Sequence, residues 1–218
     1  MSREDTIERI KAEKLIVIVR GVPKEQIVSL GRAMLEGGIR CMEVTLDQRS
    51  DDGNRNTLES IRMLNEQFGD RLHVGVGTVM TAQQVRDAAA AGAHYMISPN
   101  VNHAVIEETL RCGLVSMPGA LTPTEIADAY EHGADFVKVF PISELGAGYL
   151  KAVSAPLSHI PLLAVGGVRP ETIPEYARAG ARGFGVGGNL VNKEWIRTGR
   201  FDLLAAEARR YRAAVDEA

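Results

Sequence analysis

Only two cysteines occur in the 218 residues, Cys41 and Cys112, and they form no Cys-x-x-Cys motif. We therefore expect reduced, buried thiols, the usual state in the cytoplasm, and no disulfide framework. The sequence also lacks a basic-then-apolar leader, and no apolar run approaches the ~18 residues that would suggest a membrane span. These absences predict a cytoplasmic protein with no membrane partner.

An excess of charge of one sign is missing too. Lys and Arg number 25 against 28 Asp and Glu, which gives a net charge of −3, and 45% of the residues are apolar. This is an ordinary globular composition, and we expect no nucleic-acid partner. A small anionic ligand is compatible with it, because the charge around one site decides such binding. The histidines show no metal-ligand spacing and no His-Glu-x-x-His motif, so we expect no metal and no cofactor. They are His73, His94, His103, His132 and His159.

What the sequence does contain is a repeated strand and helix pattern, with no linker or low-complexity stretch. Segments with helical periodicity separate most of the short β-rich runs, as at 25–35, 82–91, 124–131 and 170–179. We also expect a helix at about 2–13 and another at about 201–216. The β-rich runs are 15–20, 41–46, 73–78, 95–99, 114–119, 136–141, 162–167 and 183–188.

Eight such strands predict an α/β fold, a (β/α)8 TIM barrel formed as a single domain by residues 1–218. An open, doubly wound sheet is the alternative. In a barrel the chemistry lies at the carboxyl ends of the strands, so the side chains near those ends are the candidates for function.

Lys138 stands in the middle of an apolar strand-like run. Burial disfavours a charged amine and lowers its pKa, which is what an imine-forming nucleophile needs. The alternative is an edge-strand lysine that reaches water. Because side chains alternate along a strand, the apolar residues beside Glu43 must face the helices, which leaves Glu43 inside the barrel. The same alternation places Arg20 inside, at the end of the first strand.

Glu43 and Lys138 therefore converge on one lumen with Arg20. The alternative is that the first two form only an internal salt bridge. A buried ion pair contributes little to stability because the desolvation cost can exceed the Coulombic gain, so this pair favours a functional role.

Glycine pairs follow the last two strands, at Gly166-Gly167 and Gly187-Gly188-Asn189. In barrels these two loops often form a phosphate site with backbone N–H groups, and glycine permits the close approach. Thr78 and Pro99 end the third and fourth strands and would reach the same rim, although both residue types are common there for structural reasons.

Six segments resemble, in order, the class I 2-keto-3-deoxy-6-phosphogluconate and 4-hydroxy-2-oxoglutarate aldolases. The resemblance extends from about Leu15 to Leu190. The segments are Glu43-Val44-Thr45-Leu46, Gly75-Val76-Gly77-Thr78-Val79, Ile97-Ser98-Pro99, Pro118-Gly119, Lys138-Val139-Phe140-Pro141 and Gly166-Gly167-Val168.

This resemblance implies a homotrimeric barrel that cleaves a 2-keto-3-deoxy acid to pyruvate and an aldehyde without metal. It implies that Lys138 is the Schiff-base residue and Glu43 the proton-transfer residue. It further implies that Thr78 and Pro99 line the pyruvyl pocket and that Phe140 packs beside the imine. The glycine pairs at 166–167 and 187–188 match the family's phosphate loops.

Two departures concern the substrate. Where gluconate-type members have a carboxylate-binding arginine after Glu-Val-Thr-Leu, this chain has Asp47, so Arg20 or Arg49 would have to replace it. Val165 stands where those members commonly have threonine, and both Val165 and Arg20 resemble the 6-phosphogalactonate branch. Asn189, or Gly188 in another alignment, replaces the phosphate-site serine.

The sequence thus predicts a class I aldolase that cleaves a 2-keto-3-deoxy-6-phospho sugar acid to pyruvate and glyceraldehyde 3-phosphate. Three alternatives remain. They are an aldolase for another 2-keto acid such as 4-hydroxy-2-oxoglutarate, a phosphate-binding barrel isomerase or synthase, and a degenerate, non-catalytic binding barrel.

Overall fold

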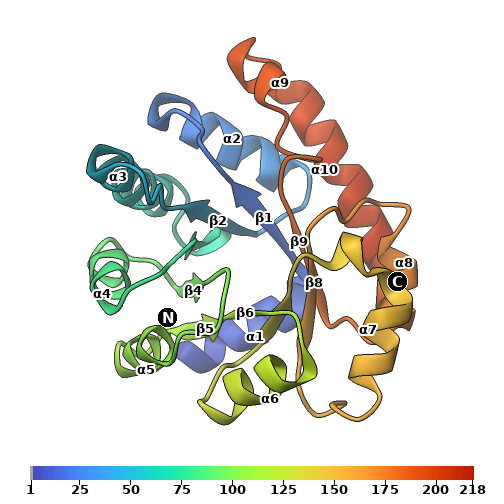
Figure 1. Cartoon of the computed structure of the whole chain (residues 1–218). Coiled ribbons are helices and arrows are strands. Elements are labelled where there is room, and N and C mark those ends of the chain that lie inside the picture. Colours follow the sequence, from blue (N-terminus) through green and yellow to red (C-terminus); the bar gives the residue numbers. More distant parts are fainter. Residues whose placement is uncertain (1) are drawn as a thin grey trace.

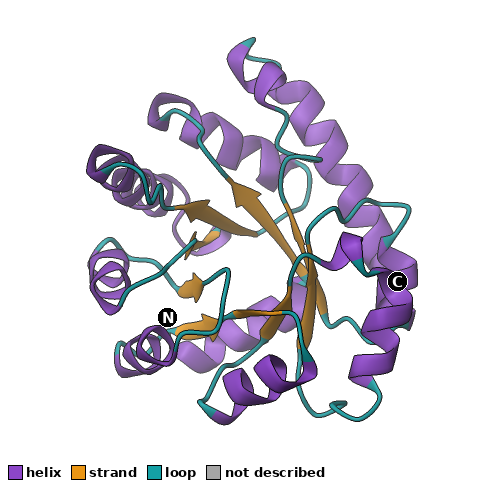
Figure 2. Ribbon diagram, viewed as in Figure 1, coloured by secondary structure: helices purple, strands orange, loops and turns teal. Residues whose placement is uncertain are grey.

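The computed structural model describes residues 2–218, whose strands form a central ring inside a shell of helices (Figure 1). All paired strands are parallel, as crossover helices between successive strands require (Figure 2). The strands are β1 (Leu15–Val19), β2 (Cys41–Thr45), β3 (His73–Gly77), β4 (Tyr95–Ile97), β5 (Val115–Met117), β6 (Gly119–Ala120), β7 (Val137–Val139), β8 (Leu162–Val165) and β9 (Gly183–Val186).

Pro118 divides the fifth barrel strand into β5 and β6. Proline has no N–H group, so it interrupts the hydrogen-bonded ladder at this point. β5 pairs with β4 on one side and β6 pairs with β7 on the other, while β1 joins β2 to β9. The Lys138 backbone N–H donates to the Pro118 carbonyl over 2.9 Å, which continues the ladder across the break. The barrel prediction is confirmed, and the open-sheet alternative is wrong.

Helices alternate with the strands, and several of them begin at a side-chain cap. Thr122, for example, caps α6 in a reciprocal arrangement with Glu125, with Pro123 at the first helical position. The helices are α1 (Arg3–Glu13), α2 (Lys24–Glu36), α3 (Asp51–Phe68), α4 (Ala82–Ala90), α5 (His103–Arg111), α6 (Pro123–Glu131), α7 (Gly146–Ser154), α8 (Ile173–Arg178), α9 (Lys193–Arg197) and α10 (Phe201–Asp216), with short 3₁₀ turns η1 (Gly69–Arg71) and η2 (Ile142–Glu144).

Two apolar clusters fill the molecule. The larger lies between strands and helices and includes Met42 and Val44, as the alternation of β2 predicts. The smaller cluster fills the barrel lumen. It includes Cys41, which points to the other side of β2 from Met42, and Phe136, which directly precedes β7. Ile10 of α1 belongs to the lumen cluster, so α1 closes the end of the barrel where the strands begin. No helix within residues 2–218 is both long and apolar enough to cross a membrane.

The two cysteines differ in burial. Cys41 is fully buried in the lumen cluster, whereas Cys112 is only partly buried. The prediction of two buried thiols was therefore wrong for Cys112. Cys112 directly follows Arg111, the last residue of α5, and precedes the strand that begins at Val115.

Candidate functional site

A cavity of about 550 Å³ opens at the carboxyl ends of the strands, where the barrel fold predicts chemistry. It brings together every residue that the sequence indicated as a site residue, except Arg49. Ile18, Val168 and Gly185 also line it. The predicted residues in its wall are Arg20, Glu43, Thr78, Pro99, Lys138, Phe140, Val165, Gly166, Gly167, Gly187, Gly188 and Asn189.

Lys138 is the central residue of β7 and is only 8% exposed. Its side-chain nitrogen lies 4.7 Å from the ring centroid of Phe140. Burial lowers the pKa of the Lys138 amine below its usual range, Glu43 opposes this shift and Arg20 adds to it. The strand therefore holds a nucleophilic nitrogen in the cavity, in a place that favours its neutral form.

Glu43 projects from β2 and is 2% exposed. Gly77 on the neighbouring strand makes room for it, because a Cβ at that position would lie 2.6 Å from Glu43 Oε1. Oε2 has no hydrogen-bond partner among residues 2–218. Burial raises the pKa of the Glu43 carboxyl to about 7, although Lys138 and Arg20 pull it down. A carboxyl with this pKa can both accept and donate a proton near neutral pH.

Glu43 and Lys138 line the same cavity but do not form an ion pair. Among residues 2–218, no N–O contact within 4.0 Å joins the two side chains, and Glu43 Oε2 lacks a partner altogether. The internal salt-bridge alternative was therefore wrong. Burying each of these polar groups costs free energy, and no ion pair between them offsets that cost. The cavity between them can therefore hold a reacting molecule that contacts both.

Arg20 and Thr78 meet at the rim of the cavity. Arg20 Nη2 donates to the Thr78 hydroxyl over 3.0 Å. Thr78 has φ +61°, a left-handed backbone conformation that is rare for a β-branched residue and marks local strain. The contact fixes one edge of the guanidinium while the rest of the group lines the cavity.

Arg49 does not line this cavity but a neighbouring hollow that it shares with Arg20 and Thr78, so its role in substrate binding stays a prediction. Its side chain is 89% exposed, and its Nε donates to Asp47 Oδ1 over 2.9 Å. Hydrogen bonds from Arg49 lower the pKa of the Asp47 carboxyl to about 2. Asp47 thus engages one of the two cations that were expected to replace the missing arginine, and the guanidinium that lines the cavity is that of the other, Arg20.

Pro99, Phe140 and Val165 form apolar parts of the cavity wall. Val165 is buried at the end of β8 and fills the space left by Gly185, where a Cβ would lie 2.8 Å from Val165 Cγ2. Phe140 is partly exposed at the rim beside the Lys138 nitrogen. The Val165 side chain itself therefore offers a substrate van der Waals contact and no hydrogen-bonding group.

The loops after β8 and β9 border the cavity on one side. Gly166 and Gly167 have φ +101° and +71°, and a Cβ at Gly167 would lie 2.5 Å from Ser143 Cβ, so this turn requires glycine. Asn189 Nδ2 donates to the Val168 carbonyl over 3.2 Å and ties the two loops together. Space around Gly188 is open, with no atom within 4 Å of a built Cβ.

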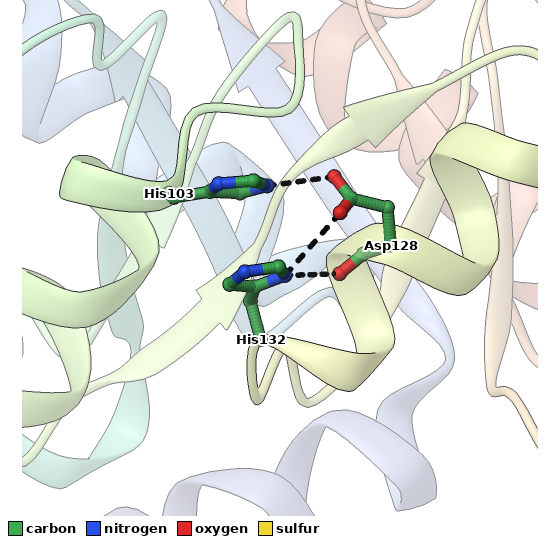
Figure 3. A group of neighbouring side chains, drawn as sticks. All are labelled: His103, Asp128 and His132. Atoms are coloured by element: carbon green, nitrogen blue, oxygen red, sulfur yellow. Dashed lines mark hydrogen bonds and ion pairs between the residues drawn. The ribbon is translucent and has the colours of Figure 1, made fainter.

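Sequence reasoning missed two groups of residues. Alternation along β1 could have identified Ile18, which shares a face with Arg20. The histidine spacing gave no metal signal, yet His103 and His132 meet at Asp128 outside the cavity (Figure 3). The separation of four residues between Asp128 and His132 on a predicted helix was an available signal for half of this cluster.

Comparison with known proteins agrees with the geometry. The family model described as KDPG and KHG aldolase matches residues 6–206. The 2-dehydro-3-deoxy-6-phosphogalactonate aldolase of Escherichia coli (strain K12) is 33% identical over 202 residues, which cover 92% of this chain and 96% of that protein. The 2-dehydro-3-deoxy-phosphogluconate aldolase of Treponema pallidum (strain Nichols) is 33% identical over 207 residues, 93% of this chain and 92% of that protein.

Among solved structures, the KDPG aldolase of Legionella pneumophila with pyruvate captured at low pH as a covalent carbinolamine intermediate is similar. It has a TM-score of 0.82 and 25% identity, and the match covers 92% of this chain and 94% of that one. Barrel, cavity and relatives define a class of protein, the metal-independent class I aldolases, which are carbon–carbon lyases. Within that class, this chain belongs to the KDPG and KHG aldolase family.

Proposed function

We propose that this aldolase cleaves a 2-keto-3-deoxy-6-phospho sugar acid to pyruvate and glyceraldehyde 3-phosphate, with Lys138 as the imine-forming residue. The observation that supports this most is the pairing of a buried amine and a buried carboxyl in one cavity without an ion pair between them. The names of the galactonate and gluconate relatives support the substrate class.

Lys138 forms the covalent intermediate. Its neutral amine attacks the C2 carbonyl carbon, the carbonyl oxygen takes up a proton, and loss of water from the carbinolamine leaves a protonated imine. The lowered pKa of the amine raises the fraction of neutral nucleophile at working pH. The positive charge of the imine then draws the electrons of the C3–C4 bond toward nitrogen.

Glu43 transfers the protons. It removes the C4 hydroxyl proton as the C3–C4 bond breaks, so the aldehyde leaves and the bonding pair forms an enamine. It then protonates C3, and water hydrolyses the resulting imine to pyruvate and the free amine. One carboxyl can serve both steps because its pKa of about 7 lies near neutral pH.

Arg20 binds the substrate carboxylate, in place of the arginine that Asp47 has replaced. A guanidinium offers a planar pair of donors that matches a carboxylate, and Thr78 holds one of its nitrogens at 3.0 Å. Pro99 and Phe140 enclose the pyruvyl end of the substrate between apolar surfaces.

The phosphate binds at the loops after β8 and β9, at Gly166, Gly167, Gly187, Gly188 and Asn189. Glycine in these loops exposes backbone N–H groups, which can donate to phosphate oxygens. Contacts to this remote group do not change during bond cleavage, but they orient C2 and C4 between Lys138 and Glu43.

Assays of pyruvate release test the substrate class. The purified enzyme should release pyruvate from the 6-phosphogalactonate and 6-phosphogluconate keto-deoxy acids with a higher kcat/KM than from 4-hydroxy-2-oxoglutarate, which has no phosphate. A preference for 4-hydroxy-2-oxoglutarate would favour the other activity in the family's description. No release from any of them would favour a binding barrel.

We also propose that the enzyme is a cytoplasmic homotrimer. The resemblance to the aldolase family supports the trimer, and the exposed Phe140 and Leu145 near the mouth of the barrel offer apolar surface for a subunit contact. Light scattering on a sizing column should give three times the mass of one 23.6 kDa chain. A monomer at all concentrations would contradict the trimer.

A further inference from the structure

His103, Asp128 and His132 form a cluster on the outer wall of the barrel, between α5 and α6 (Figure 3). His103 is the first residue of α5, and His132 directly follows Glu131, the last residue of α6. His103 Nε2 lies 2.7 Å from Asp128 Oδ2. His132 Nδ1 lies 3.4 Å from Asp128 Oδ1 and 2.8 Å from the Asp128 carbonyl oxygen. Both rings thus direct a nitrogen at one residue.

The two imidazole rings also stack, with centroids 3.6 Å apart and an angle of 9° between the planes. A neutral imidazole nitrogen has a free lone pair and is a common ligand of divalent metal ions. The cluster therefore has the donor atoms of a metal site.

The distances suit a tetrahedral ion. One ligand atom from each residue lies within 4.8 Å of the other two. Zinc bonds to nitrogen and oxygen of about 2.0–2.2 Å place neighbouring ligand atoms about 3.4 Å apart in a tetrahedron. The side chains of His103, Asp128 and His132 are 47%, 38% and 36% exposed, so the rings can tilt out of the stack toward one ion without disturbing the core.

We propose that His103, Asp128 and His132 bind a divalent transition-metal ion of the zinc type. Two imidazoles and one carboxylate suit Zn²⁺, whereas Mg²⁺ and Ca²⁺ prefer oxygen ligands alone. The ion would join α5 to α6. His103 and Asp128 also line a surface hollow with Pro99 and Phe140, which border the candidate active site. The ion lies outside the catalytic cavity and takes no part in the cleavage.

Calorimetric titration with Zn²⁺ tests this site, on tag-free protein that has been treated with EDTA and desalted. We expect one saturable Zn²⁺ site per chain and no comparable heat from Mg²⁺. His103→Ala, Asp128→Asn and His132→Ala should each weaken binding by at least roughly tenfold, since loss of even an outer-shell partner commonly costs this much. Zn²⁺ should also raise the Tm of the wild type and not that of the triple variant.

Two control variants separate this cluster from other surface ligands. His159→Ala removes an exposed histidine outside the cluster, and Cys112→Ser removes the partly buried thiol. Both should bind Zn²⁺ like the wild type. Absence of saturable binding, or equal binding by the wild type and the three cluster variants, would overturn the proposal.

A second, independent observation concerns the residues behind Thr78. Gln48 Nε2 donates to the Thr78 carbonyl over 2.7 Å, and Gln84 Nε2 donates to Gln48 Oε1 over 3.0 Å. Gln84 Oε1 accepts from the Met80 backbone N–H over 2.8 Å. A chain of hydrogen bonds thus runs from α4 to Thr78, whose hydroxyl in turn accepts from Arg20.

We infer that Gln48 and Gln84 are positioning residues for Arg20. The left-handed backbone of Thr78 is unfavourable for a β-branched residue and persists only where its surroundings fix it. The bond from Gln48 to the Thr78 carbonyl supplies that restraint and so sets the direction of the hydroxyl. This inference rests on the proposed role of Arg20 in binding the substrate carboxylate.

Steady-state kinetics on Gln48→Ala, Gln84→Ala and Arg20→Ala test the chain of contacts. Gln48→Ala should raise KM by about 2- to 12-fold, the equivalent of one hydrogen bond, with kcat little changed. The double variant with Gln48→Ala and Arg20→Ala should have the same KM as Arg20→Ala, because both substitutions act through the same guanidinium. Gln83→Ala, on the same helix but bonded outward to Asp87, is the matched control and should leave KM unchanged.

If KM rises in Arg20→Ala but is unchanged in Gln48→Ala, the positioning role is overturned and the proposed role of Arg20 stands. A full further rise in the double variant would do the same, since it would indicate a general loss of structure. An unchanged KM in Arg20→Ala would instead remove the proposed role of Arg20, and the positioning role with it.

Discussion

The two ends of the barrel lumen are built from the same strands but contain opposite chemistry. Where the strands begin, Tyr95, Val115 and Phe136 are fully buried among apolar neighbours and covered by α1. Where they end, Glu43 and Lys138 are equally buried but face a cavity, and Glu43 Oε2 has no partner. Packing at one end offsets the desolvation of the polar groups at the other, which predicts that substitutions at the two ends affect stability in opposite directions.

The largest effect on activity is expected at Lys138. Lys138→Met keeps the length of the side chain but removes the nucleophile, so pyruvate release should fall to background. Because the variant no longer buries an amine without an ion-pair partner, its Tm should equal or exceed that of the wild type. Activity assays and thermal unfolding check both parts. Substantial residual turnover would mean that another group forms the imine.

The opposite effect is expected at the closed end of the lumen. Tyr95→Ala removes a fully buried ring whose space Gly75 provides, since a Cβ there would overlap the ring. We expect a loss of about 3–5 kcal/mol in the free energy of unfolding. The corresponding fall in Tm is about 6–20 °C for a chain of this size. The kcat of the folded fraction should change little, and a selective loss of kcat without loss of Tm would contradict the division of roles.

Glu43→Gln sharpens the comparison because it keeps the shape of the side chain and removes its charge and basicity. Cleavage should slow by about 10²-fold or more, since proton transfer by a positioned group typically contributes 10²–10⁴-fold. The imine should still form, so pyruvate should still be trapped on Lys138. Full activity in this variant would leave Glu43 without a role in proton transfer.

The same variant gives a pH test of stability. The folded-state pKa of Glu43, about 7, lies above the ordinary glutamate value of 4.5, so the folded wild type binds more protons than the unfolded chain between these values. Its stability must therefore fall as the pH rises from 4.5 to 7. Glu43→Gln avoids this loss and should be more stable than the wild type at pH 8 but not at pH 4. Denaturant unfolding at the two pH values measures the difference.

The smallest effect is expected at Val165, on substrate choice. An apolar side chain without a hydrogen-bonding partner discriminates between isomers by only ~1–3 kcal/mol. The galacto and gluco 6-phosphates should therefore both be cleaved, with rates within roughly two orders of magnitude. Val165→Thr adds a hydroxyl and should shift the ratio of kcat/KM values toward the gluco compound. A wild type that cleaves only the gluco isomer, or an unchanged ratio in the variant, would refute this.

The contents of the lumen could be predicted from the sequence because strands impose a period of two. That period placed Glu43, Lys138 and Arg20 on inward faces before any contact was known. It does not apply in loops, where no periodicity fixes the direction of a side chain, and this is why the sequence could not show that Arg49 lies outside the cavity. Asp47 is two residues from Arg49, so only the folded loop shows that their side chains pair.

Features that depend on neighbours across the fold could not be predicted in this way. The division of the fifth strand follows from Pro118 lying in the hydrogen-bonded ladder, which a β-rich run alone does not indicate. His103 lies 25 residues before Asp128, and only the packing of α5 beside α6 brings them together. The restraint on Thr78 likewise requires Gln48 and Gln84 from separate segments.

The most direct test of the central claim is to incubate the enzyme with pyruvate and borohydride and to map the modified residue by mass spectrometry. Reduction of the imine fixes the pyruvyl carbons to the nitrogen that formed it. We predict a single modification on Lys138 together with loss of turnover, and no modification in Lys138→Met. Labelling of another lysine, or none at all, would contradict the assignment of Lys138 as the imine-forming residue.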